Sequence, residues 1–223
     1  MEVVQRVNYG SVKLAGKYNP PSFENTRIPV FGYLIKTKGA TILVDTGVGS
    51  DHPYITKVFE PELVEIEQAL ARCETTIGEV DCVVNSHLHF DHCGNNRRFR
   101  GITHYAQSAE IEAAVSDNYT IKEWISDLDV VAVTGDLEIA DGVTLLETPG
   151  HTPGHQSILV EVANSKFLVA AQAAFSFTEF VSGGDPEIQA HEGFEDEYRA
   201  SLRRLTAMDA DRIFLSHDVR EFA

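Results

Sequence analysis

Short apolar runs rich in β-branched residues recur along the chain, and turn-forming residues bound each of them. Such runs predict buried β-strands. The predicted strands are 28–35, 41–44, 82–84, 130–133, 143–146, 158–162 and 167–170. Residues 1–14 alternate small apolar and polar residues, and they lack the basic flank and apolar core of a secretory signal. This N-terminal segment is therefore predicted to be a further strand.

Two segments have the period of amphipathic helices instead. Residues 61–72 place Leu63, Ile66 and Leu70 on one face, and residues 194–208 repeat apolar side chains at helical spacing. Helices lie between strands in both halves of the chain, and no low-complexity linker separates the halves. The pattern predicts one layered α/β domain over residues 1–223, in which helices cover the faces of the sheets.

Two of the apolar runs end in the same pair of residues. Residues 83–87 are Val-Val-Asn-Ser-His, and residues 213–217 are Ile-Phe-Leu-Ser-His. The end of a strand on a rigid scaffold can present a side chain to a cleft, so we expect His87 and His217 to point toward one place. The likeness also indicates two similar halves.

Charge and composition exclude several classes of function. The chain has 34 acidic and 18 basic residues, a net charge of -16, so it should repel nucleic acids and anionic membrane surfaces. No run of about 18 apolar residues is long enough for a membrane-spanning helix. The three cysteines have no Cys-x-x-Cys spacing, which favours reduced thiols over disulfides or a thiolate zinc site. These features predict a cytoplasmic protein.

The densest candidate chemistry follows the predicted strand 82–84. His87, His89, Asp91 and His92 bring three imidazoles and a carboxylate into six residues. Neutral imidazole and carboxylate are ligands of first-row metals, and this spacing lets alternate side chains point to two neighbouring positions. The segment therefore predicts a metal site, in preference to a polar loop that happens to be rich in histidine.

A second histidine segment follows another predicted strand. Residues 148–155 are Thr-Pro-Gly-His-Thr-Pro-Gly-His, in which His151 lies at the exit of the strand. Alone, His151 would be interpreted as a turn residue, but beside the first cluster it is a candidate ligand. We expect His155 to brace this loop by hydrogen bonding and Cys93 to pack as a small apolar residue.

These segments and the late Ser-His217-Asp pattern resemble the metallo-β-lactamase superfamily over nearly the whole chain. Within it, the sequence is most similar to the quorum-quenching N-acyl homoserine lactone lactonases. The segments that carry this likeness are 28–30, 32–35, 43–47, 86–92 and 151–157. The resemblance implies a four-layer αβ/βα sandwich with its metal site at the ends of the sheets.

The resemblance also implies a metal centre and an activity. Two metal ions per chain, usually zinc, are expected, one held by His87, His89 and His151. The second would be held by Asp91, His92 and His217. The implied reaction is hydrolysis of a lactone or related ester by a hydroxide on the metals, with Asp91 passing a proton to the leaving alkoxide. Asp45 resembles the family's aspartate that orients a group of the metal site.

Two residues depart from the lactonase pattern. Gln172 stands where the family has an aspartate that bridges both metals, and Phe175 stands where the lactonases have a tyrosine that contacts the lactone carbonyl. A neutral amide is a poorer bridge, so the second metal should be held more weakly. Three interpretations stay open. Gln172 is a weak ligand in a site of two metals, or it indicates a site with one metal, or the chain is an inactive or altered variant. Phe175 has no hydrogen-bond donor.

The substrate pocket and the reaction leave alternatives open. Phe175 and His191 are pocket candidates, and Phe23, Phe177 and Phe180 are either pocket or core residues. A thioesterase of the glyoxalase II kind would use the same hydroxide chemistry, and an iron dioxygenase would use one metal. A metal-binding scaffold without turnover is the alternative outside enzymes. The expected partner is a small lactone or ester, with a homodimer as a further possibility.

Overall fold

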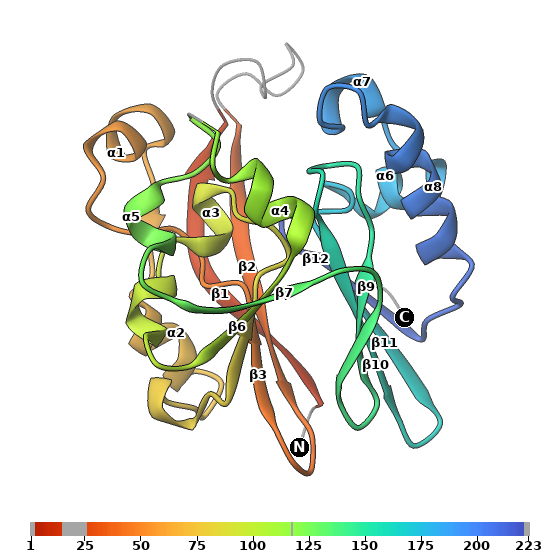
Figure 1. The fold of residues 1–223 in the computed structure, drawn as a ribbon, viewed down its shortest axis with the longest axis horizontal. Helices are drawn as coiled ribbons and strands as arrows, with labels where there is room; N and C mark the ends of the chain where they lie inside the picture. The colour runs from red at the N-terminus through yellow and green to blue at the C-terminus, as the bar shows by residue number, and fades with distance from the viewer. Residues whose placement is uncertain (1–2, 15–25, 117, 221–223) are drawn as a thin grey trace.

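Two β-sheets face each other in the computed structural model, which describes residues 3–14, 26–116 and 118–220 (Figure 1). The first sheet contains, in spatial order, β4 (Glu62–Leu63), β1 (Val4–Lys13), β2 (Arg27–Lys36), β3 (Thr41–Val44), β5 (Cys82–Val84), β6 (Thr103–Gln107) and β7 (Asp129–Val133). The second contains β12 (Arg212–Leu215), β11 (Ser165–Ala171), β10 (Gln156–Val162), β9 (Val143–Glu147) and β8 (Leu137–Ala140).

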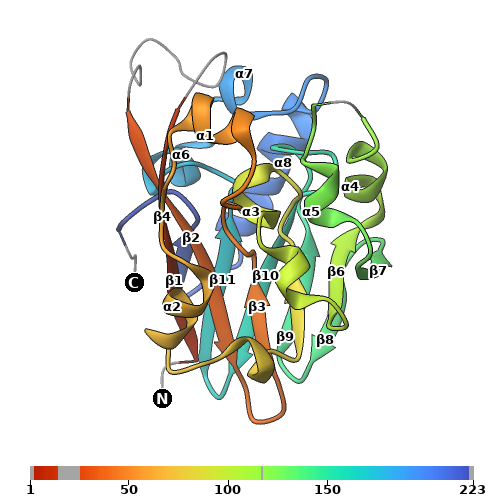
Figure 2. The same cartoon turned by 90° about the vertical axis from the view of Figure 1, so that its left-hand side faces the viewer.

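Helices cover the outer face of each sheet. Those associated with the first sheet are α1 (Pro53–Phe59), α2 (Ile66–Ala71), α3 (Phe90–Cys93), α4 (Ser108–Ala113) and α5 (Lys122–Ile125), with 3-10 turns at Ile77–Glu79 and Asn96–Phe99. Those outside the second sheet are α6 (Phe177–Ser182), α7 (Pro186–Gln189) and α8 (Glu195–Thr206). Figure 2 shows α1, α2 and α3 in front of the first sheet. Within the described ranges, no helix is both long and apolar enough to cross a membrane.

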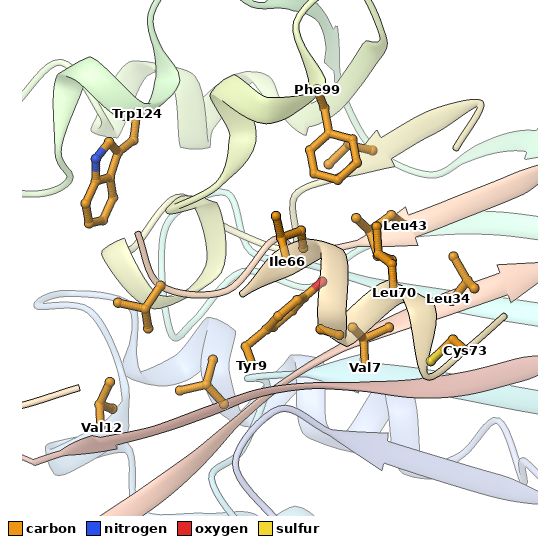
Figure 3. Close-up of a cluster of buried hydrophobic side chains, with 14 of the residues drawn as sticks. Val7, Tyr9, Val12, Leu34, Leu43, Ile66, Leu70, Cys73, Phe99 and Trp124 are labelled. Atoms are coloured by element: carbon orange, nitrogen blue, oxygen red, sulfur yellow. The ribbon is translucent and has the colours of Figure 1, made fainter. Parts of the chain in front are cut away.

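Three apolar layers join these elements into four structural layers. One layer lies between the sheets, where Tyr33 and Phe214 are buried with ring centroids 5.3 Å apart. Another packs the first sheet against its helices and includes Tyr9, Ile66 and Trp124 (Figure 3). A third packs the second sheet against α6 and α8. The predicted αβ/βα sandwich is confirmed.

The prediction of an amphipathic helix over 61–72 is wrong for the first residues of that range. Glu62 and Leu63 form β4, which pairs with Ser11 and Gly10 of β1, and the helix begins at Ile66. The edge of β1 offers backbone hydrogen bonds to this segment, so pairing replaces the first helical turn. The predicted helix at 194–208 is confirmed as α8, and the predicted strands correspond to observed ones within two residues where both are described. The prediction that these strands are buried is wrong for 130–133, because β7 is the edge strand of its sheet and is exposed except at Val133.

The strand directions bring several loops together. β3, β5 and β6 are parallel neighbours in the first sheet, and β12 runs parallel to β11 in the second. The loops that leave β3, β5, β9, β11 and β12 carry Asp45, His87–His92, His151, Gln172 and His217 respectively. The candidate site is therefore built by strand ends of both sheets.

Candidate metal centre

Six side chains gather into two triads of possible ligands. His87, His89 and His151 form the first triad, and Asp91, His92 and His217 form the second. Within each triad, the ligand atoms lie within 4.8 Å of one another. The triads adjoin, because the ring centroids of His87 and His92 are 4.0 Å apart. The structure thus brings together all six side chains as the sequence predicted.

Hydrogen bonds orient the rings of the first triad. Nδ1 of His87 donates to Oγ of Ser86 at 3.1 Å, and Nδ1 of His151 donates to the carbonyl oxygen of Gln189 at 3.0 Å. Nδ1 of His89 lies 3.2 Å from Nε2 of His151. Because the outer nitrogens of His87 and His151 are engaged, their Nε2 atoms face the interior of the triad.

The second triad is anchored in the same way. Nδ1 of His217 donates to the carbonyl oxygen of Pro29 at 2.8 Å, and Nδ1 of His92 donates to Oδ2 of Asp45 at 2.8 Å. Oδ2 of Asp91 lies 3.6 Å from Nε2 of His217 and 3.8 Å from Nε2 of His92. The carboxylate and the two imidazoles converge on one point.

The donor set fits divalent metal ions such as zinc. Nε2 of His87 and Nε2 of His217 are buried and have no hydrogen-bond partner among the described residues. Buried polar atoms normally have partners, so these two nitrogens are placed for a ligand that the protein alone does not supply. Together with the other four donors, they offer the nitrogen and oxygen ligands that zinc takes.

The electrostatic environment keeps the first triad in its metal-binding form. Burial, and then neighbouring imidazoles, lower the pKa values of His87, His89 and His151 well below that of a free histidine. Burial also lowers the pKa of His217, to about 4. These rings are therefore neutral near pH 7, which is the form that coordinates metals.

Asp45 links the loop after β3 to the segment after β5. It follows β3 with a positive φ of 60°, and its Oδ1 accepts a hydrogen bond from the backbone of Ser86 at 2.7 Å. Its Oδ2 accepts from Oγ of Ser86 at 2.7 Å and from His92. Although burial alone lowers the pKa of His92, the charges of Asp91 and Asp45 raise it overall. Asp45 thus contacts a candidate ligand directly, as the resemblance implied.

Gln172 lies against the second triad. It is 5% exposed, and its Oε1 lies 2.9 Å from Nε2 of His92. Both ring nitrogens of His92 therefore face oxygen atoms. The amide oxygen occupies a position from which it could contact a metal held by Asp91, His92 and His217.

Of the two predicted pocket residues, Phe175 adjoins the second triad, and His191 is near enough to the first triad that, besides burial, its charge helps to lower the pKa of His89. The ring of Phe175 stacks on His217, with centroids 5.1 Å apart, and both line a cavity of about 220 Å³. His191 is exposed, its backbone bonds to Gly150, and its ring faces Phe194. The structure places His191 outside both triads.

The other aromatic and loop residues considered in the sequence analysis that the structure describes pack in the core or brace a loop. Phe177 and Phe180 pack in the core beneath α6 and α8, and Phe23 lies outside the described residues. His155 braces its loop, since its Nδ1 lies 2.9 Å from Oγ1 of Thr148, and burial lowers its pKa to about 3. Cys93 is fully buried in an apolar cluster.

Sequence reasoning missed two groups beside the centre. Phe90, between His89 and Asp91 in the chain, is partly exposed and packs on Phe59 of α1 with centroids 4.3 Å apart. The apolar residue inside the histidine cluster was the available signal for this aromatic wall. The second group is the buried carboxylate of Glu110, for which the local sequence holds no signal.

Comparisons with known proteins agree with this geometry. The model of the metallo-beta-lactamase superfamily matches residues 25–217. An N-acyl homoserine lactonase of Bacillus cereus is 32% identical over 212 residues, which cover 87% of this chain and 83% of the relative. The N-acyl homoserine lactonase AttM of Rhizobium radiobacter is 32% identical over 190 residues, which cover 72% of this chain and 70% of AttM.

Solved structures give the same result. A variant of the Bacillus thuringiensis lactonase AiiA, with N-decanoyl-L-homoserine bound at its active site, superposes with a TM-score of 0.80. Its sequence identity is 28%, and the superposition covers 98% of this chain and 95% of AiiA. The fold, the paired triads and the sequence match lead to one assignment: the chain belongs to the metallo-β-lactamase superfamily.

Proposed function

We propose that this protein is a metal-dependent hydrolase that opens the ring of a lactone, with N-acyl homoserine lactones as the substrate class. The observation that carries the proposal is the pair of adjoining, pre-oriented ligand triads in a chain similar to N-acyl homoserine lactonases over most of its length. When bound, two divalent ions such as zinc polarise a carbonyl and lower the pKa of water. Both capacities are needed to hydrolyse an ester.

The proposal assigns a role to each group of residues. His87, His89 and His151 hold one ion, and Asp91, His92 and His217 hold the other, with Gln172 as a weak additional ligand. Asp91 also gives a proton to the alkoxide that leaves when the ring opens. Its carboxylate is held on a short helix beside His217, and so it can act at a fixed point.

The surroundings support an acyl substrate. Phe59 and Phe90 pack on each other and are partly exposed, and Phe90 stands between two candidate ligands in the chain, so together they offer an apolar surface for an acyl chain. Phe175 lies against His217 but offers no donor to a carbonyl. Substrates that depend less on that hydrogen bond, including small lactones without an amide, are therefore included in the proposed class.

Three further predictions belong to the proposal. The net charge of -16 supports a protein with neither a nucleic acid nor a membrane as its partner. We place the protein in the cytoplasm as one domain over residues 1–223. A homodimer stays a prediction from the sequence.

The test combines metal analysis with a substrate panel. Purified protein should contain about two equivalents of zinc or a similar ion, and it should hydrolyse N-acyl homoserine lactones in a pH-stat assay. Asp91→Asn should lower kcat by at least about 100-fold, because general acid catalysis typically contributes that much. Asp196→Asn, an exposed change on α8, is the matched control.

The outcomes separate the alternatives. If the protein hydrolyses thioesters but not lactones, its function is that of a thioesterase and the lactonase proposal is wrong. No hydrolysis of any lactone, ester or thioester, with Asp91→Asn changing only the metal content, would leave a metal-binding scaffold.

A further inference from the structure

Glu110 is a fully buried carboxylate that the proposed chemistry does not use. It lies on α4, and its relative exposure is 0%. Burying a carboxylate costs free energy unless hydrogen bonds compensate. Its four hydrogen-bond partners in the described chain are neutral donors, so its oxygens serve only as acceptors.

The two oxygens of Glu110 bind two different loops. Oε1 accepts from the backbone nitrogen of Leu88 at 2.7 Å and from the hydroxyl of Tyr119 at 2.5 Å. Oε2 accepts from Oγ1 of Thr152 at 2.6 Å and from the backbone nitrogen of Gly154 at 3.2 Å. One carboxylate therefore joins the loop after β5 to the loop after β9.

Three of the four contacts lie next to a ligand of the first triad. Leu88 stands between His87 and His89 in the chain, and Thr152 follows His151 directly. The ring of Tyr119 lies 5.1 Å from the ring of His89. Glu110 thus reaches all three ligands of this triad through residues that touch no metal themselves.

The packing around Gly154 supports the same conclusion. A Cβ atom on Gly154 would lie 2.1 Å from the backbone nitrogen of Glu110 and 2.6 Å from its Cα. Only glycine lets the loop come this close to the start of α4. The second loop is therefore shaped to contact this part of α4, and the contact is specific in geometry.

We propose that Glu110 is a positioning residue that fixes the loops of His87, His89 and His151 relative to each other, so that the first triad is preorganised for its metal. The inference rests on the proposed metal centre. Burial raises the pKa of Glu110, while hydrogen bonds from Thr152, Tyr119, Leu88 and Gly154 oppose that rise. The network favours the charged acceptor over a neutral substitute.

Glu110→Gln is the direct test, because it keeps the shape and removes one acceptor. Whichever way the new amide turns, its NH2 group meets the backbone N–H of Leu88 or of Gly154, and neither can accept a hydrogen bond. Partners of this kind typically change metal affinity by about 10- to 100-fold. We expect a loss of this size at the first triad alone.

Two variants, used as backgrounds for Glu110→Gln, allow each triad to be measured separately. His217→Ala leaves the first triad complete, and His151→Ala leaves the second. Zinc affinity is measured in each background by competition with a chromogenic chelator. Glu110→Gln should weaken zinc binding about 10- to 100-fold in the His217→Ala background and leave it unchanged in the His151→Ala background. Glu112→Gln, exposed on the same helix, is the control.

Several results would overturn the proposal. Unchanged affinity in the His217→Ala background, or equal losses in both backgrounds, would show that Glu110 does not act on the first triad specifically. If Glu110→Gln fails to fold, Tyr119→Phe removes one donor and keeps the ring, and it should weaken the first triad by about 2- to 10-fold. An unmodified chain that binds no zinc would instead overturn the proposed function.

Discussion

The amide oxygen of Gln172 lies 2.9 Å from Nε2 of His92, on the side of the ring opposite Asp45. We propose that this neutral group stands where the lactonase pattern leads one to expect a second carboxylate. The charge available to the second triad comes from Asp91 directly and from Asp45 through His92. Since the amide is buried and hydrogen-bonded, it belongs to the centre and is not a solvent-exposed substitution.

Gln172→Glu should strengthen binding of the second metal ion. Glutamate has the shape of glutamine and adds one negative charge beside two dications. At this short distance, the Coulomb attraction should increase the affinity for the second ion by more than about tenfold. Without metal, the same charge is buried near Asp91, so the metal-free variant should unfold at a lower urea concentration than the parent. The measurements are metal stoichiometry during dialysis against chelator and urea unfolding with and without zinc.

Gln68→Glu adds the same charge on the exposed face of α2 and serves as the matched control. It should change neither quantity. Equal retention of the second ion by Gln172→Glu and by the parent would mean that Gln172 does not contribute to that site.

Asp45→Asn should weaken the second metal site by about 10- to 100-fold, since partners of metal-bound histidines commonly have effects of this size. Asparagine tolerates the positive φ of 60° at this position, so the backbone is preserved. Asparagine keeps one acceptor oxygen, so it cannot accept both from the backbone N–H of Ser86, now bound to Oδ1, and from His92 and Oγ of Ser86, now bound to Oδ2. Calorimetric zinc titration should show a weaker second event and an unchanged first event, whereas loss of both events would indicate general unfolding of the centre.

The sequence was sufficient to select the six candidate ligands that the fold brings together, because they lie in dense local patterns. His87 to His92 form one run, His151 stands in a Pro-Gly turn, and His217 ends a strand. Each pattern is defined by neighbours in the chain. The two-sheet architecture could be predicted for a related reason, since several of its strands, such as β2, β3 and β11, are apolar runs that are largely buried on both faces.

Features that depend on distant partners left no such pattern. Glu110 is one of two glutamates on the short helix α4, and its contacts include backbone groups of two remote loops. β6 was missed because it carries polar side chains such as His104 and Gln107, which are buried inside the protein. β4 was missed because its strand character comes from pairing with β1. Tertiary contacts decide all three cases.

Tyr33→Phe should destabilise the contact between the sheets. The hydroxyl of Tyr33, on β2, donates to the carbonyl oxygen of Leu215, on β12, at 2.6 Å, and the ring is fully buried. Leaving a buried acceptor without this donor costs about 1 to 3 kcal/mol. Urea unfolding of the metal-free protein measures the change. Tyr54→Phe, at a tyrosine that is 59% exposed, should stay within about 0.5 kcal/mol of the parent.

Cys82 should react slowly with iodoacetamide in the folded protein. Burial, and then the charge of Asp81, raise the pKa of its thiol to about 11, from a reference value of 9.0. The reactive species is the thiolate, and a pKa two units higher leaves about 100-fold less of it at pH 8. Labelling, followed by mass spectrometry of the Cys82 peptide, should accelerate about tenfold per pH unit up to about pH 11.

Two further measurements isolate the cause of the slow labelling of Cys82. Asp81→Asn removes the smaller of the two causes, so it should increase the rate only modestly, while unfolding in urea removes burial and should increase it most. If Cys82 reacts in the folded chain as fast as in the unfolded chain, the thiol is accessible and ionises normally. The end of β5 that lies opposite the metal-binding loop would then be more open to solvent than its half-buried position indicates.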